Sequence, residues 1–163
     1  INLKNELNKI SNFCINKKSV EINEILKLTN LAYNYNFSEL VDHCLAKNKM
    51  QTLNILNENN QSPEDNIMII KTFLYKLKRL KKLRVELDNK KNIDLVISSF
   101  KPPIFWKDKE IVKVQLNKWK PNQVKKLIND ISNTELEIKK NYNNSIFIIT
   151  NFLFEQSYTQ INN

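Results

Sequence analysis

Hydrophobic residues recur every three or four positions along most of this chain, a spacing that places them on one face of an α-helix. Near the N-terminus the pattern predicts an amphipathic helix over residues 2–15 and a short helix over residues 22–28. The segment 31–37 is aromatic and rich in Asn, but it has no clear period. We interpret it as a linker, or as the junction between two domains.

Helical spacing resumes at Ser38, whose hydroxyl is suited to cap a helix, and continues almost to the end of the chain. A further start signal is Ser62-Pro63-Glu64-Asp65, which combines a capping hydroxyl, Pro in the first turn and acids at the positive helix end. Predicted helices in this part cover residues 38–45, 50–56, 63–87, 93–97, 104–119, 121–138 and 145–158. The predicted fold class is all-α, with a small N-terminal helical piece at residues 1–36 and a bundle of five to seven helices at residues 37–163.

The last predicted helix is apolar nearly all round, because residues 146–154 read IFIITNFLF. A helix without a polar face is buried on several sides, either in its own domain or against a partner. Its candidate core or subunit-interface residues are Ile146, Phe147, Ile149, Phe152 and Leu153. The chain has no apolar run of the ~18 or more residues that a membrane span requires, so no membrane partner is expected.

Residues 98–119 contain a Pro102-Pro103 break between two helical patterns. Because a residue that precedes Pro disfavours the helical conformation, the chain is expected to change direction there. We expect Trp106 and Trp119 to anchor the core. Three lysines flank the break and either face a partner or lie in a solvated loop: Lys101, Lys107 and Lys109.

The composition disfavours several classes of function. The chain has no Gly, which supplies the positive-φ positions of phosphate-binding loops and dinucleotide fingerprints. Two Cys and one His do not make a usual zinc set, and free buried thiols in a reducing cytosol are expected. Asp42-His43-Cys44 combines acid, imidazole and thiol, but adjacent residues on a helix point in different directions. We therefore expect Cys44 in apolar packing, Asp42 and His43 exposed, and no catalytic residue, metal ligand or cofactor.

The formal net charge is +9, a balance that attracts polyanions or acidic protein surfaces. Positive charge is densest over residues 76–84, where Lys78, Arg79 and Lys82 are expected to share one exposed strip. With Arg84 they are candidates for contact with DNA phosphates or with an acidic partner. The run lacks the interleaved aromatic residues of a stacking platform. An ordinary solvated helix face is the alternative interpretation.

Several motifs together resemble one family. Residues 98–131 read SSFKPPIFWKDKEIVKVQLNKWKPNQVKKLINDI. This stretch is similar to the C-terminal region of the delta subunit of bacterial DNA polymerase III, a clamp-loader subunit. In that family a Pro-Pro-aromatic turn leads to a helix that contains Gln and ends in Trp, and the next helix carries an acid and a Lys four residues apart. The matching positions here are Pro102, Pro103, Phe105, Gln115, Trp119, Glu135 and Lys139. The last two also form a predicted surface pair on a helix.

The resemblance extends upstream in the same order. Residues 37–42, FSELVD, look like the opening of the family's collar domain, and Ser62-Pro63 with the long basic helix look like its second helical pair. Residues 5–10, NELNKI, resemble the helix of the small lid domain that precedes the collar. The chain starts without Met and opens in a helical pattern, so we expect it to be part of a longer protein.

The resemblance implies a lid-like piece at residues 1–36 and a collar domain at residues 37–163 that joins clamp-loader subunits in a ring. It implies a cytoplasmic bacterial, non-motor subunit of the DNA polymerase III holoenzyme that helps to load the sliding clamp onto primed DNA. No ATP hydrolysis by this chain is implied. The sliding clamp would be contacted only by the family's N-terminal ATPase-like domain, which these residues do not include, and DNA only through the parent complex. A basic helical nucleic-acid-binding module is the second hypothesis.

Overall fold

The computed structural model describes residues 2–15, 17, 19–28, 31–58, 61–90 and 92–158. Within these ranges the regular structure is helical and no strand occurs, so the predicted all-α class is confirmed. The chain divides into two compact units, residues 1–37 and 38–163.

The first unit contains two helices that pack on each other, α1 (Asn2–Cys14) and α2 (Ile22–Leu28). Both lie where the hydrophobic spacing predicts them. Glu24 fixes the start of α2, because its Oε2 accepts a hydrogen bond from the backbone N–H of Glu21 at 3.1 Å. Its Oε1 also lies 2.6 Å from the Lys17 ammonium. A carboxylate in this position satisfies a donor that the helix start leaves unpaired.

Helix α3 (Leu31–Leu45) runs through the segment predicted as a linker. Residues 31–37 are therefore helical and do not form an irregular linker, whereas the alternative interpretation, a junction between two domains, agrees with the unit boundary that follows Phe37. The physical reason is visible in the side chains that are buried, which follow helical spacing from the last residue of that segment: Phe37, Leu40, Val41 and Cys44.

α3 ends at Leu45, and a residue in the left-handed conformation that is not Gly follows two positions later. Lys47 has a φ of 61°. Its backbone N–H donates to Cys44 O at 3.1 Å, and the N–H of Asn48 donates to His43 O at 2.9 Å. This pair of bonds is a Schellman motif, whose left-handed position usually carries Gly because a Cβ is disfavoured there. Asn48 then begins α4 (Lys49–Glu58), since its Oδ1 accepts the Gln51 N–H at 3.2 Å.

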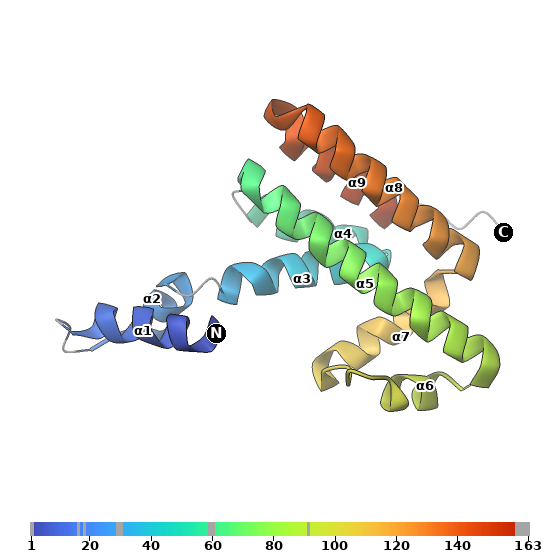
Figure 1. Ribbon diagram of the computed structural model, residues 1–163, viewed down its shortest axis with the longest axis horizontal. Coiled ribbons are helices and arrows are strands. Elements are labelled where there is room, and N and C mark those ends of the chain that lie inside the picture. The colour runs from blue at the N-terminus through green and yellow to red at the C-terminus, as the bar shows by residue number, and fades with distance from the viewer. Residues whose placement is uncertain are drawn as a thin grey trace. The chain divides into compact units, whose positions relative to one another are not determined.

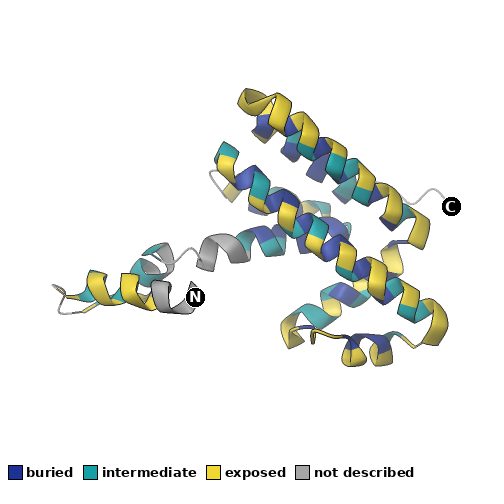
Figure 2. Ribbon diagram, in the orientation of Figure 1, coloured by how far each residue is buried: buried dark blue, intermediate teal, exposed yellow. Residues whose placement is uncertain are grey.

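Helix α5 (Pro63–Lys90) is the centre of the second unit and contacts α6, α7, α8 and α9 (Figure 1). It starts at Pro63 as predicted, but the observed hydrogen bonds make the Ser62 hydroxyl a donor: the Asp65 carboxylate accepts from both the N–H and the hydroxyl of Ser62, at 2.7 and 2.8 Å. Its buried face is shown in dark blue in Figure 2. The apolar residues of that face are Ile69, Ile70, Phe73, Leu77, Leu80 and Leu83.

The Pro-Pro corner lies between α6 (Ile93–Ser99) and α7 (Lys109–Lys118), with one turn of 3-10 helix at Trp106–Asp108. The helix predicted from residue 104 thus begins later. Phe100 and Ile104 are buried on either side of the corner, whereas both prolines are exposed. The two helices are also linked by Lys113, whose Nζ lies 2.8 Å from the Asp94 carboxylate.

The last two helices lie side by side, α8 (Pro121–Lys140) and α9 (Ser145–Tyr158) (Figure 1). A short 3-10 turn, Tyr142–Asn144, connects them, and the Tyr142 hydroxyl donates to Glu64 at the start of α5 at 2.7 Å. The predicted surface pair on α8 is confirmed, with Lys139 Nζ 2.7 Å from Glu135 Oε1. α9 also packs against α4 and α5.

Candidate functional site

The predicted basic strip on α5 divides between two environments. Lys78 and Lys82 are exposed. Arg79 is half-buried instead, and its Nη2 lies 3.7 Å from Oδ1 of the buried Asp42. The expectation of one exposed strip is therefore wrong at Arg79. A guanidinium beside a buried carboxylate is held inside the bundle by the charge of its partner.

Arg84 is also directed into the structure. Its Nη1 donates to the backbone carbonyl of Leu116 at 3.1 Å, and its Nη2 lies 3.3 Å from Asp88 Oδ1. The Leu116 carbonyl belongs to the last turn of α7, where carbonyls have no partner within the helix. Of the four candidate basic residues, Lys78 and Lys82 thus present their charge to solvent, while the two arginines connect parts of the bundle.

The candidate interface residues of α9 divide in the same way. Ile149, Phe152 and Leu153 belong to the core, and the Phe152 ring meets Phe73 edge to face at 5.4 Å between centroids. Ile146 and Phe147 point outward, and Phe147 is 75% exposed. Phe147 is the most exposed aromatic side chain among the residues that the structure describes. Of the five candidate residues on α9, Ile146 and Phe147 are therefore the two that are exposed to solvent.

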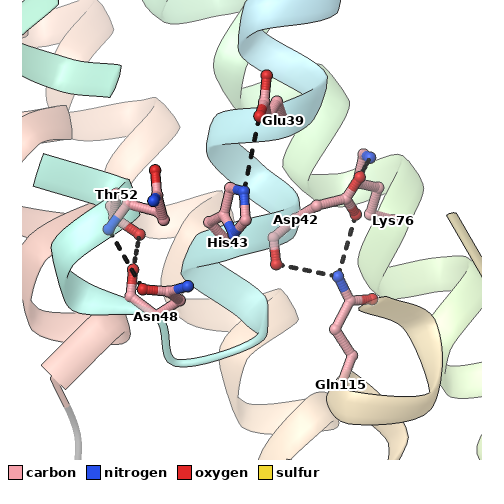
Figure 3. Close-up of polar contacts among 8 residues, drawn as sticks. Glu39, Asp42, His43, Asn48, Thr52, Lys76 and Gln115 are labelled. Atoms are coloured by element: carbon pink, nitrogen blue, oxygen red, sulfur yellow. Dashed lines mark hydrogen bonds and ion pairs between the residues drawn. The ribbon is translucent and has the colours of Figure 1, made fainter. Parts of the chain in front are cut away.

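A buried polar cluster joins three helices around Asp42, and Figure 3 shows its members pointing toward one another. Lys76 on α5 forms an ion pair with the Asp42 carboxylate, and the Lys76 side chain is only 4% exposed. Gln115 on α7 donates from Nε2 to Asp42 Oδ1 at 3.0 Å and to the Asp42 carbonyl at 3.1 Å. Asp42 was expected to be exposed, and that expectation is wrong. Burial is tolerated because the carboxylate is paired and hydrogen-bonded.

The charges in this cluster act on one another. Burial lowers the pKa of Lys76, and the neighbouring Asp42 carboxylate opposes that change. His43, the next residue along α3, lies 3.7 Å from Glu39 and is half-buried rather than exposed. The Asp42 carboxylate is therefore committed to Lys76, Arg79 and Gln115, and His43 is directed toward Glu39. This geometry does not form the acid–imidazole–thiol arrangement that the sequence Asp42-His43-Cys44 suggests.

Trp119, the residue that follows α7, also contacts the C-terminal end of α3. Its indole N–H donates to the Leu45 carbonyl at 2.7 Å, so its expected role as a core anchor is confirmed. The Lys47 ammonium lies 4.0 Å from the centre of the Trp119 ring and donates to the carbonyl of Gln156 near the end of α9. Cation–π contact and carbonyl capping thus join α3, α9 and the residue that follows α7.

Burial shapes the chemistry of two groups at this junction. It raises the pKa of the Cys44 thiol to about 12, and the thiol sulfur lies 3.3 Å from the Leu153 carbonyl. Burial also lowers the pKa of Lys47 to about 8. A thiol that stays protonated is a poor nucleophile. The expected apolar packing of Cys44 is confirmed.

Two aromatic side chains next to the Pro-Pro corner are exposed. Trp106, expected in the core, is 68% exposed and lies beside exposed Phe105, with 5.7 Å between ring centroids. The Lys107 ammonium lies 5.3 Å from the Trp106 ring centre. The core-anchor expectation for Trp106 is wrong because Phe100 and Ile104 fill the buried positions at this corner. The resulting surface combines flat aromatic rings with positive charge.

Among the described residues, no three His, Cys, Asp or Glu side chains are grouped closely enough to hold a metal ion. No helix in the described ranges combines the length and hydropathy of a membrane span. No protein-family model, curated protein or solved structure matches this chain.

Proposed function

We propose that this chain is a partial lid-like piece and the collar domain of a delta-type clamp-loader subunit, and that it acts as a cytoplasmic assembly module in loading the sliding clamp onto primed DNA. The observation that carries the proposal is the convergence of the motifs that resemble the family. Asp42 from residues 37–42, and Gln115 and Trp119 from residues 98–131, meet at one buried junction. Motifs that are more than 70 residues apart therefore belong to a single structural unit.

The surface supports an assembly role in a second way. Ile146 and Phe147 on α9 are apolar, exposed and outside the core. In a subunit that joins a ring, such residues would be covered by a neighbouring subunit. The family's collar functions through helix faces of this kind, so the proposal needs no catalytic group in this chain.

A competition experiment tests the proposal. The 163 residues do not include the family's clamp-binding ATPase-like domain. Added to a reconstituted clamp loader from the same organism, the chain should occupy the delta position in the ring and inhibit clamp loading. Excess full-length delta subunit should relieve the inhibition. Clamp loading that is unaffected by a large excess of the chain contradicts the proposal, and circular dichroism confirms that the added chain is folded.

The exposed pair Phe105 and Trp106 favours a second candidate function, direct contact with single-stranded DNA. Aromatic faces stack on bases and contribute about 1–3 kcal/mol per base. Lysines that surround the pair, or that lie on the exposed face of α5, would neutralise phosphates: Lys78, Lys82, Lys101 and Lys107.

Fluorescence anisotropy with a labelled oligonucleotide tests this second function. Binding should weaken as salt rises, and both Trp106→Ala and the pair Lys78→Glu/Lys82→Glu should reduce it. The variant Tyr158→Ala is a matched control, because Tyr158 is an exposed aromatic residue on α9, outside both the corner and the exposed face of α5. Equal DNA affinity for wild type and Trp106→Ala would show that the Trp106 ring does not stack on a base.

A further inference from the structure

A small pocket opens between α8 and α9 on the second unit. Its volume is about 180 Å³. Pockets for drug-sized ligands usually have volumes of ~300 Å³ or more, so this one is closer in size to a single side chain. The lining residues that matter here are Thr134 and Glu137 on α8 and Phe147, Asn151, Phe152 and Glu155 on α9.

The lining is acidic although the chain is strongly basic. Glu137 and Glu155 contribute one carboxylate from each helix, and none of the described lining residues is Lys or Arg. The whole chain has 26 Lys and Arg against 17 Asp and Glu. Asn151 donates to Glu155 Oε1 at 3.2 Å, which orients that carboxylate. The pocket is therefore a local site of negative charge.

Two aromatic rings complete the pocket. Phe152 is almost fully buried, and Phe147, at the exposed edge, has most of its ring in solvent. An aromatic face attracts a cation that lies within about 6 Å of the ring centre. Carboxylates together with an aromatic face match the guanidinium of arginine, which accepts bidentate carboxylate partners and also stacks on rings. A lysine ammonium matches the charge, but it lacks the planar face.

We propose that this pocket binds one arginine side chain that projects from a partner protein, and that the α8–α9 face around Phe147 is the docking surface. The argument for this occupant is charge complementarity in a pocket of side-chain size. Arginine and aromatic residues are the usual energetic centres of protein interfaces. The identity of the partner rests on the proposed function, under which it is another clamp-loader subunit.

The first experiment tests the pocket without any partner protein. N-acetyl-L-arginine amide is titrated into the 15N-labelled chain and compared with N-acetyl-L-glutamine amide, which is similar in length but uncharged. The arginine compound should shift the amide signals of Phe147, Asn151 and Glu155, and the variant Glu137→Gln/Glu155→Gln should abolish the shifts. Shifts of equal size with the glutamine compound, or shifts confined to other helices, overturn the proposal.

The second experiment measures assembly with the other clamp-loader subunits by analytical ultracentrifugation. Glu137→Lys and Glu155→Lys should each weaken assembly at least about tenfold, because charge reversal places like charges together. Glu58→Lys, the same change at an exposed position on α4 outside the pocket, is the control and should leave assembly unchanged. If both pocket variants assemble as strongly as wild type, the proposed arginine pocket is wrong and the proposed function is unaffected. If the wild type does not assemble at all, the proposed function fails, and the arginine titration alone decides the inference.

Discussion

Gln115 on α7 binds Asp42 on α3 twice, through the side-chain carboxylate at 3.0 Å and through the backbone carbonyl at 3.1 Å. One amide group thus fixes both the position of a helix and the orientation of its buried charge. Because Lys76 approaches the same carboxylate from α5, three helices that are distant in sequence are joined at one point. The packing of the second unit depends on this junction.

Asp42→Asn should destabilise the chain strongly. The change keeps an acceptor for Gln115 but leaves the Lys76 ammonium buried without its carboxylate. Breaking a buried ion pair from one side typically costs about 3–5 kcal/mol. Guanidinium unfolding followed by circular dichroism measures the difference. Asp88→Asn breaks the Arg84 pair on the exposed side of α5 and should cost less than about 1 kcal/mol.

The double variant Asp42→Asn/Lys76→Met separates charge burial from packing. Removing both charges should recover part of the stability lost in Asp42→Asn, because Lys76 is then no longer an unpaired buried charge, whereas Arg79 still lacks its carboxylate partner. A double variant that is less stable than the single variant by the full cost of Lys76→Met indicates that the two residues act independently. That result contradicts a coupled pair.

Trp119→Phe and Trp106→Phe make the same chemical change in opposite environments. Trp119→Phe leaves the buried Leu45 carbonyl without its donor and should cost about 1–3 kcal/mol. Trp106→Phe removes an exposed indole and should lie within about 0.5 kcal/mol of wild type. Unfolding in guanidinium gives both values. Equal losses in the two variants argue against the indole–carbonyl bond as the anchor.

Lys47 makes stability depend on pH. Burial lowers its pKa in the folded chain from 10.5 to about 8. Between these two values the unfolded state binds more protons than the folded state, so the contribution of Lys47 to folding stability rises with pH. Below about pH 8 the full cost of burying the ammonium is present. The stability of wild type relative to Lys47→Met should therefore increase as the pH is raised from about 8 to 10.5.

The comparison with Lys47→Met removes the part of the pH dependence that both proteins share, including the titration of the Cys44 thiol in the unfolded chain. In the folded wild type the Lys47 charge also lowers the pKa of that thiol, so the measured difference includes their coupling. Both chains also place a side chain with a Cβ at the left-handed position after α3, so backbone strain is matched. Thermal unfolding at several pH values measures the difference. A constant difference across this range indicates that Lys47 has the same pKa in the folded and unfolded chains and contradicts its burial.

The two cysteines should react at very different rates. Cys44 is buried and its pKa is raised to about 12, whereas Cys14 is half-buried in the first unit. The thiolate is the reactive form, so iodoacetamide at about pH 8 should label Cys14 in the folded chain and Cys44 only after unfolding. Peptide mass spectrometry identifies the labelled site. Labelling of Cys44 at the rate of Cys14 means that α3 does not pack against α9 as described.

Hydrophobic spacing and capping signals predict most helix positions because both depend on neighbouring residues. Ser62 with Pro63, and Pro121, start α5 and α8 as local chemistry predicts. The sequence of segment 31–37 does not by itself predict a helix, because the buried positions that continue its spacing, Leu40 and Cys44, lie beyond its end. The aromatic and Asn-rich composition of the segment makes the hydrophobic spacing of the longer helix hard to recognise.

The polar junction could be anticipated only in part. Lys76 lies three residues after Phe73 and four before Leu80, so it falls on the buried face of α5, and a buried cation requires a partner. Nothing local identifies Asp42 as that partner, since the pairing arises when α3 and α5 pack together. The same holds for Arg79, which local charge places on the surface and tertiary contact draws inward. Trp106 is the opposite case: its large apolar ring predicts burial, but Phe100 and Ile104 occupy the buried positions and the ring is exposed.

The most direct test of the proposed function is native mass spectrometry of this chain mixed with the other clamp-loader subunits of the same organism. The account predicts a complex whose mass equals the sum of those subunits and this chain, and it predicts that Phe147→Glu reduces that species while the chain stays folded. Spectra that contain only the free chain, or only copies of the chain bound to one another, would contradict the proposal that it is a clamp-loader collar.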